Sequence, residues 1–262
     1  MELNDLSTRV AVRAEAGGDG SSHALTRQAH VWLARPQPAL DSDSRNQLLS
    51  LLDQAEKNRY HRFVFDKDRD HYLAAHALVR TALSRYADVA PGDWKFVANR
   101  YGRPEIAGEC GAPFLRFNLS HTHGLVVCVV SDEIDCGVDA ERIRPFANYL
   151  SIAKWMFTEE EYAQLVAAAP ARRHETFFSY WTLKEAYIKA RGFGLSLSTT
   201  SFRFSIEESR RISIHFNAAA DDRSDAWQFQ LLRPTDEHVV ALALKSGSRN
   251  DAIQQRWLAD VM

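Results

Sequence analysis

The first half of the chain carries helical patterns of apolar residues, together with segments typical of strands. Within residues 42–63, and again within 67–87, apolar side chains recur at intervals of three and four residues, which predicts a helix in each range. Pro91 and Gly92 end this helical region. Strands are predicted for HVWLAR, for WKFVANRYGRPEI as it runs into a turn, and for LVVCVVS, whose continuous apolar run is typical of a buried strand.

The second half also has helices followed by strands. It opens with CGVDAERI, a predicted strand, and residues 146–156 have a helical pattern. A further helix begins at Thr158, and a long helix runs from Arg172 to Arg191 before stopping at Gly192 and Gly194. The remaining strand candidates are SFRFSIEE, RISIHFN, WQFQLLR and HVVALALK.

This order of elements predicts a mixed α/β (α+β) chain in two parts. Residues 24–133 and 134–248 are the two predicted subdomains, and each falls within the size of a single domain, although one sheet shared by both is an equally good prediction. Residues 1–23 contain a segment rich in Gly and Ser and are expected to form a flexible tail. Residues 249–262 are a predicted C-terminal extension. The residues themselves show no internal repeat.

Composition and charge narrow the class of protein. The chain is 45% hydrophobic and 25% charged, and its net charge of −2 provides no basic field that would recruit nucleic acid. No apolar run approaches the roughly 20 residues that span a bilayer. The first residues lack the pattern of a signal peptide, so we expect a soluble cytoplasmic protein that does not enter a membrane. The three cysteines fit neither a zinc motif nor a closed disulfide framework, and we expect buried or idle thiols.

The segment GVDAE places two carboxylates on one side of a predicted strand. Because alternate strand residues point to the same face, Asp139 and Glu141 project together. Their like charges repel unless a cation lies between them, and Mg²⁺ favours one or two carboxylates together with phosphate oxygens and water. A polar sheet face, or ion pairs with Arg142 and Arg144, would explain the same pattern, so both interpretations stay open here.

The segment SYWTLKEAYIKARGFG mixes apolar and charged residues along one helical stripe. The stripe consists of Trp181, Lys184, Glu185, Ile188 and Lys189. A stripe that faces solvent should lack Trp and Ile, and one that faces the core should lack the charges, so the mixture suits a cleft with charged groups at its lip. The alternative is a surface pair of Glu185 and Lys189, which contributes only about 0.2–0.5 kcal/mol, beside a Lys184 that extends its ammonium group to water.

Four further polar residues are weaker candidates. His121 and its neighbour Ser120 lie just before the buried strand, where functional residues gather, although an ordinary turn histidine is the simpler explanation. The tight turn YGRPE presents Arg103. Thr158 and Glu161 fit a capping box, T-x-x-E, and this explanation requires no catalytic role for Glu161.

Together these segments resemble a known family. GRP, FNLSH, GVDAE and WTLKEAYIKARGFGL, in this order and at these spacings, resemble the motifs of the Sfp-type 4′-phosphopantetheinyl transferases, and KEA resembles their W/KEA subgroup. The resemblance runs from about Ala24 to Lys245. It implies two similar subdomains related by a pseudo-twofold, with the active-site cleft between them. It also implies transfer of the phosphopantetheine arm of coenzyme A to a serine of an apo acyl or peptidyl carrier protein, with release of 3′,5′-ADP.

The resemblance also implies roles for individual residues. The ligands of a Mg²⁺ ion would be Asp139, Glu141 and Glu185. Contacts to coenzyme A would come from Arg59, Arg103, Ser120, His121, Lys184 and Lys189. The catalytic residues would be Glu185, Lys189 and Glu161. The serine proton would pass to Glu185, to Glu161 or to a metal-bound water relayed by a carboxylate.

The protein partner implied by the resemblance is a carrier protein, which usually presents an acidic helix beside an apolar patch. Lys154, Trp155, Met156 and Phe157 could form the docking surface, although core packing explains the three apolar residues equally well. We expect the enzyme to act as a monomer. The competing hypotheses are another Mg²⁺-dependent phosphohydrolase and a non-catalytic protein that binds coenzyme A or a carrier. The presence of every expected metal and phosphate residue counts against the non-catalytic protein.

Overall fold

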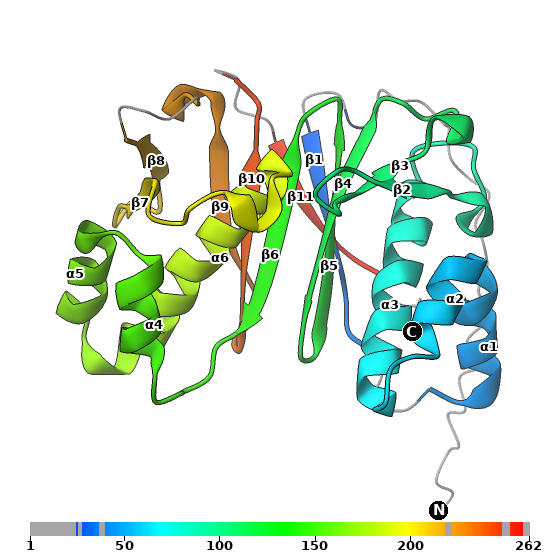
Figure 1. The fold of residues 1–262 in the computed structure, drawn as a ribbon, viewed down its shortest axis with the longest axis horizontal. Coiled ribbons are helices and arrows are strands. Elements are labelled where there is room, and N and C mark those ends of the chain that lie inside the picture. Colours follow the sequence, from blue (N-terminus) through cyan, green and yellow to red (C-terminus); the bar gives the residue numbers. More distant parts are fainter. Residues whose placement is uncertain (1–24, 26–27, 37–39, 218–221, 248–251, 259–262) are drawn as a thin grey trace, which may run out of the picture.

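The structure is a computed structural model, and it describes residue 25 and residues 28–36, 40–217, 222–247 and 252–258. The predicted tail therefore lies outside the described residues. Figure 1 shows helices on both outer sides of the molecule and strands between them. Among the described residues, no helix is both long and apolar enough to cross a bilayer.

The N-terminal half contains the predicted helices and strands, with one helical range divided. Asp53 starts a new helix inside residues 42–63, because its carboxylate accepts the backbone N–H of Glu56 while the Glu56 carboxylate accepts the N–H of Asp53. The elements are β1 (Gln28–Ala34), α1 (Ser42–Leu51), α2 (Gln54–Tyr60), α3 (Asp66–Leu83), β2 (Phe96–Ala98), β3 (Pro104–Ile106), β4 (Leu115–Thr122) and β5 (Leu125–Asp132).

The C-terminal half confirms the predicted order of one strand, three helices and four strands. Its elements are β6 (Cys136–Arg142), α4 (Tyr149–Met156), α5 (Glu159–Ala167), α6 (Arg173–Arg191), β7 (Phe202–Ile206), β8 (Ile212–Phe216), β9 (Gln228–Thr235) and β10 (His238–Leu244). Part of the predicted C-terminal extension forms β11 (Ala252–Trp257), which pairs in parallel with β1 of the other half.

The two halves share one topology. In each half a first strand is followed by helices, a short hairpin and two more strands. The strand that comes last lies in the middle of each sheet, giving the orders β1-β5-β4 and β6-β10-β9 with antiparallel neighbours. This confirms the α/β class and reveals a similarity between the halves that their residues do not display.

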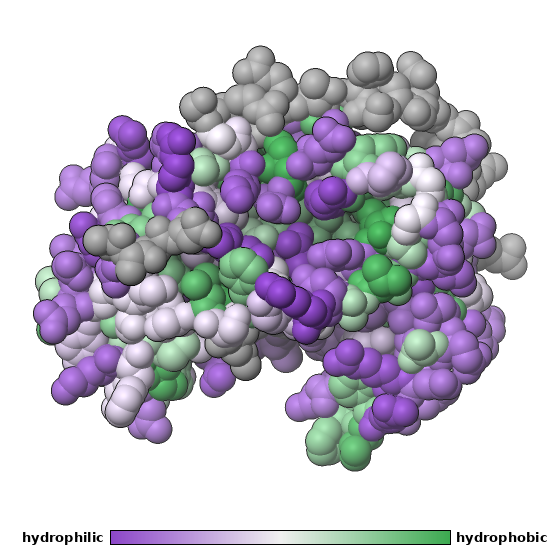
Figure 2. All heavy atoms as spheres, turned by 45° about the horizontal axis from the view of Figure 1, so that its top comes forward, coloured by the Kyte–Doolittle hydropathy of each residue, from purple (hydrophilic) through white to green (hydrophobic). Residues whose placement is uncertain are grey.

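The two sheets pack face to face, with helices on both outer sides (Figure 1). Alternate residues of β5, such as Val127 and Val129, share a core with residues of β6 and β10, such as Val138 and Val240. The intervening residues of β5 pack beneath α3, and those of β10 pack beneath α6. Viewed from a different angle, the surface is hollowed along the lower edge, between the two sides of the molecule (Figure 2).

Helix α6 lies very close to β6 at Gly137. A Cβ atom at this position would lie 2.0 Å from the carbonyl oxygen of Ala186 and 2.5 Å from the backbone nitrogen of Ala190. Any other residue would push the helix away from the strand, so the glycine permits this contact. The contact brings the C-terminal turns of α6, including Lys189, against the acidic residues of β6.

Candidate active site

The candidate site lies where α6, β6 and β4 meet, so both halves of the molecule contribute to it. The Lys189 Nζ atom on α6 lies 2.6 Å from Asp139 Oδ1 on β6. On β4, Ser120 donates its hydroxyl to the same Asp139 oxygen at 2.9 Å and accepts a hydrogen bond from Lys189 at 3.0 Å. Three residues that were singled out from separate segments of the sequence therefore converge.

The second oxygen of Asp139 is buried without a partner. Asp139 is only 6% exposed, and its Oδ2 atom has no hydrogen-bond partner among the described residues. A buried acceptor that has lost water without gaining a donor costs about 1–3 kcal/mol. An oxygen kept in this state at a polar site is a suitable ligand for a cation.

Two further carboxylates are affected by the charge of Asp139. Burial raises the pKa of Glu141 to about 7, and the charges of Asp139 and Glu185 add to this rise against the opposing effects of Lys189 and Arg144. Burial also raises the pKa of Glu185, with Asp139 adding to the rise and Lys189 opposing it. The three acids thus lie within electrostatic reach of one another, and a cation would relieve their repulsion.

The three acids do not form a ready-made metal cluster. Within the part of the chain that the structure describes, no three His, Cys, Asp or Glu side chains are grouped so that they could hold a metal ion. Mg²⁺ requires less from a protein, because phosphate oxygens and water supply most of its ligands. Asp139, with its unpartnered oxygen, and Glu141, two residues further on the same strand, fit an ion that is bound together with phosphate groups.

His121 extends the site towards α3. Desolvation lowers the pKa of His121, and the neighbouring His71, Lys189 and His76 lower it further, against the opposing charge of Asp139. A neutral imidazole can donate one N–H to a phosphate oxygen. His71 and His76 lie on α3 and were missed from the sequence, because nothing in a helical pattern marks them as neighbours of β4.

Lys184 is enclosed in the C-terminal half and does not reach this site. Its Nζ atom lies 2.8 Å from Glu161 Oε2 and donates to the carbonyls of Thr199 at 2.7 Å and Phe202 at 3.0 Å. The side chain is 2% exposed, and burial lowers its pKa while Glu161 opposes this effect. With its three donors occupied, the ammonium group has none left for a phosphate, so the expected contact with coenzyme A finds no support in the structure.

Glu161 has the structural role that its capping box predicts. Its carboxylate accepts the backbone N–H groups of Thr158 at 2.9 Å and Phe204 at 2.8 Å, in addition to the ion pair with Lys184. The side chain is 0% exposed. No serine of a partner protein could approach it in this arrangement, so the expected role of Glu161 as a base is also unsupported, and we assign the Glu161–Lys184 pair to the core.

Arg103 connects the two halves. From the turn before β3, its guanidinium group donates to the carbonyl of Ala190 at the end of α6, at 2.9 Å, and to that of Cys136 at the start of β6, at 3.3 Å. Its buried Nε atom has no partner within the described ranges. The contact with the nucleotide that the resemblance implies stays a prediction, because the guanidinium group here binds backbone of the other half.

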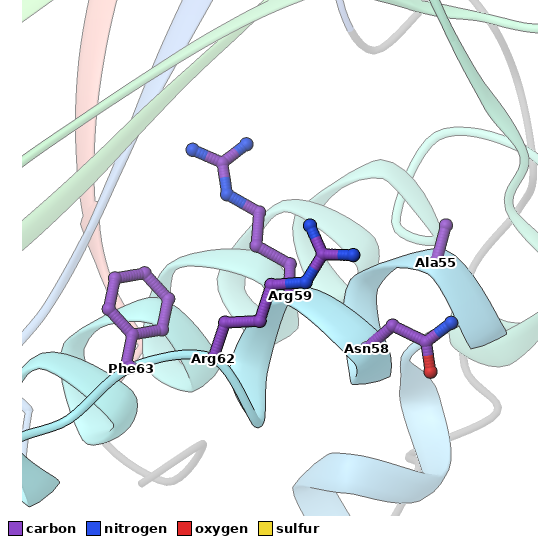
Figure 3. A pocket seen from close by; sticks show the side chains of 5 residues that line it. All are labelled: Ala55, Asn58, Arg59, Arg62 and Phe63. Atoms are coloured by element: carbon purple, nitrogen blue, oxygen red, sulfur yellow. The ribbon is translucent and has the colours of Figure 1, made fainter.

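Arg59 lines a hollow of about 620 Å³ at the end of α2. Figure 3 shows that the side chains of Arg59 and Arg62 stand out from this part of the chain beside Phe63. The Arg59 guanidinium group lies 5.8 Å from the ring centroid of Tyr72, whose ring is in turn 4.0 Å from that of His76. Arg59 therefore lies next to Tyr72 of α3, and Tyr72 in turn lies next to His76. The contact of Arg59 with a phosphate of coenzyme A remains a prediction.

Comparisons with known proteins agree with this architecture. The family model described as the 4′-phosphopantetheinyl transferase superfamily matches residues 135–243, and the model described as 4′-phosphopantetheinyl transferase, N-terminal, matches residues 40–133. The chain is 31% identical over 223 residues to 4′-phosphopantetheinyl transferase HetI of Nostoc sp., covering 84% of this chain and 89% of the relative.

Two other similarities complete the comparison. 4′-Phosphopantetheinyl transferase Sfp of Bacillus subtilis is 30% identical over 184 residues, covering 70% of this chain and 78% of the relative. A crystal structure of a Bacillus anthracis holo-(acyl-carrier-protein) synthase in complex with CoA (3′,5′-ADP) is a distant neighbour, with a TM-score of 0.36, 19% identity, and coverage of 44% of this chain and 96% of that chain. The two family models and the identity with HetI show that the chain belongs to the 4′-phosphopantetheinyl transferase superfamily, as an enzyme of the Sfp type.

Proposed function

We propose that the site around Asp139 and Lys189 carries out the activity of this family, the transfer of the 4′-phosphopantetheine arm of coenzyme A to a serine of a carrier protein. The observation that supports this most strongly is the carboxylate of Asp139. Lys189 and Ser120 hold one of its oxygens, and the other is buried without a partner among the described residues. The site thus offers an anionic position for a cation and a cationic side chain for a phosphate.

We assign Mg²⁺ binding to Asp139 and Glu141, with Glu185 as the third acid of the set. Mg²⁺, when bound, neutralises charge on the pyrophosphate and favours attack at phosphorus. Lys189 is 29% exposed at the same place and supplies a positive charge for the leaving phosphate. His121 adds a hydrogen-bond donor from the other half of the molecule.

The transfer exchanges one phosphorus–oxygen bond for another. The hydroxyl oxygen of the carrier serine bonds to the phosphorus that carries the pantetheine arm, and the bond from that phosphorus to the oxygen of 3′,5′-ADP breaks. The serine proton passes to Glu185, which can accept it as a carboxylate of the same site. Lys189 and His121 stabilise the charge on the leaving oxygen, which is the main contribution that proteins make to phosphoryl transfer.

Of the four residues expected to form the docking surface for the carrier protein, only Lys154 and Trp155 are exposed. Phe157 is 3% exposed and belongs to the C-terminal core, and Met156 packs against the same core. Trp155 is 83% exposed on α4, with Ile152 and Lys154 exposed beside it. We propose this exposed apolar and basic surface as the contact for the apolar patch and acidic helix of the carrier.

A mass measurement on the carrier protein tests the proposal. Incubation of the enzyme with coenzyme A, Mg²⁺ and an apo carrier should add one phosphopantetheine arm to the carrier, and EDTA should prevent the addition. Asp139→Ala should lower the rate by about 10³-fold, while its circular dichroism spectrum matches that of the wild type. Release of 3′,5′-ADP from coenzyme A while the carrier stays unmodified would favour a hydrolase instead, and binding of coenzyme A without turnover would favour a binding protein.

A further inference from the structure

Side chains of β4 bridge the seam between the two sheets. Three alternate residues of β4 accept hydrogen bonds from the backbone N–H groups of three alternate residues of β6: Asn118 from Val138 at 2.9 Å, Ser120 from Ala140 at 3.2 Å, and Thr122 from Arg142 at 3.2 Å. Each pair is 20 residues apart, so the two strands run in the same direction in one constant register. We call these three side chains the β4 side-chain ladder.

The ladder takes the place of backbone pairing along this seam. Strands β4 and β6 belong to different sheets, and β6 pairs its other edge with β10. Buried backbone N–H groups are nearly always paired, so the edge of β6 that faces β4 needs acceptors. Oxygen atoms of side chains provide them here. The spacing of these side chains along β4 therefore determines the register of β6 relative to β4. Neither a turn nor backbone hydrogen bonds between the two strands set it.

This register determines the geometry of the site. Asp139 and Glu141 alternate along β6 with the three ladder donors. Ser120 takes part in both arrangements, because its hydroxyl accepts from the Ala140 N–H and donates to Asp139. Since neighbouring strand residues point to opposite faces, a slip of one residue would remove Asp139 from Ser120 and from Lys189.

We propose that Asn118 and Thr122 are positioning residues for the transfer reaction, which hold the metal-binding acids of β6 in register with the phosphate-binding end of β4. The inference rests on the proposed function of Asp139. Asn118 is buried at 6% exposure, and Thr122 follows His121 at the end of β4. Both act through the backbone of β6 and are not assigned any contact with coenzyme A.

The test compares Thr122→Val with Thr122→Ser. Valine has the shape of threonine but no acceptor for the Arg142 N–H, whereas serine retains the hydroxyl. Coenzyme A is titrated calorimetrically into each protein with and without Mg²⁺ and without a carrier, so that the readout does not depend on turnover. Ser131→Ala is the matched control, because it removes a buried hydroxyl on β5, which donates to the Ile134 carbonyl at 2.8 Å, outside the ladder.

Mg²⁺ should strengthen coenzyme A binding to the wild type, and this gain should shrink by about tenfold in Thr122→Val. Thr122→Ser and Ser131→Ala should retain the gain within about threefold, whatever they do to the melting temperature. Asn118→Leu repeats the test at the buried end of the ladder, and Thr122→Val remains decisive where that variant does not fold. A full gain in Thr122→Val, or an equal loss in Thr122→Ser or Ser131→Ala, would overturn the inference.

Failure of the proposed function has a different signature. Asp139→Ala should show no gain from Mg²⁺ at all. A wild-type protein whose coenzyme A binding ignores Mg²⁺ would overturn the metal assignment itself, and with it the positioning role. A wild type that responds to Mg²⁺, beside a Thr122→Val variant that responds equally, would overturn the positioning role alone.

Discussion

Two lysines of helix α6 each form an ion pair with a carboxylate on another element: Lys184 with Glu161 of α5, and Lys189 with Asp139 of β6. The two pairs differ in how deeply they are buried. Lys184 lies 2.8 Å from Glu161, with the two side chains 2% and 0% exposed. Lys189 lies 2.6 Å from Asp139, with the side chains 29% and 8% exposed. We call the first the closed pair and the second the open pair. Both lysines belong to the same conspicuous motif of the sequence.

The difference lies in how completely each pair satisfies its polar atoms. In the closed pair, the ammonium group has three oxygen partners and the carboxylate accepts two backbone N–H groups as well. In the open pair, Asp139 Oδ2 has no partner among the described residues. A complete set of partners indicates a structural ion pair, and an incomplete set beside raised carboxylate pKa values indicates a binding site.

The largest expected effect comes from breaking the closed pair. Lys184→Met should lower the free energy of unfolding by about 3–5 kcal/mol, because it leaves the Glu161 charge buried without its partner. Urea denaturation measures this change. The double variant Glu161→Gln/Lys184→Met should recover a large part of the loss, since neither charge then remains buried. A single variant as stable as the wild type would contradict the structural role.

The open pair should respond in the opposite way. Lys189→Met should lower kcat/KM for transfer by about 100-fold, because a charge that stabilises the leaving phosphate is lost. Its free energy of unfolding should fall by less than in Lys184→Met, because the Lys189 side chain is 29% exposed whereas that of Lys184 is 2% exposed. Steady-state kinetics and urea denaturation on one preparation check both statements. A large loss of stability with normal kinetics would place Lys189 in the core instead.

An effect of intermediate size is expected in the pH dependence of Mg²⁺ binding at the site of the open pair. Glu141 has a pKa of about 7 in the metal-free protein, so it is protonated below that pH and must lose this proton to bind a cation. The gain in coenzyme A affinity from Mg²⁺ should therefore fall by about tenfold from pH 8 to pH 6. Titration calorimetry at both values measures it. Glu141→Gln is the control, because the part of the pH dependence that it retains belongs to other groups, such as the phosphates.

The smallest effect is expected at the surface of α4. Here too a buried and an exposed residue can be compared, because Phe157 is buried and Trp155 is exposed. Trp155→Ala should raise KM for the carrier about fivefold, equivalent to about 1 kcal/mol, without changing KM for coenzyme A. Val166→Ala, an exposed apolar residue on α5, is the matched control and should change neither value. Equal effects of both substitutions would argue against a specific docking surface.

Most helices and strands can be predicted from the sequence, because the spacing of its apolar residues matches the period of the element that each segment forms. The sequence also brought Asp139, Ser120 and Lys189 together, but only through the family resemblance. The helical stripe was misleading for Lys184: residues 184 and 189 lie about 140° apart around a helix, so the two lysines face different neighbours. The partners of Lys184 at Thr199 and Phe202 belong to a later segment, and no period in α6 indicates them.

Other features depend on contacts between distant segments. Gly137 is the second residue of β6, and a glycine within a strand often marks a close approach of another backbone, so this signal could have revealed the contact with α6. The β4 side-chain ladder leaves a weaker signal, because alternating polar residues on a strand also describe a face in contact with water. The pairing of β11 with β1 joins the first and the last of the described strands, and no local pattern predicts it.

We propose that only the open pair takes part in the reaction. The most direct test of this proposal is the transfer rate of the folded double variant Glu161→Gln/Lys184→Met, measured below its melting temperature by the mass of the carrier. We expect a rate within about threefold of the wild type, since both charges lie outside the site. A loss of about 100-fold, equal to that of Lys189→Met, would show that the closed pair takes part in catalysis and would contradict the account.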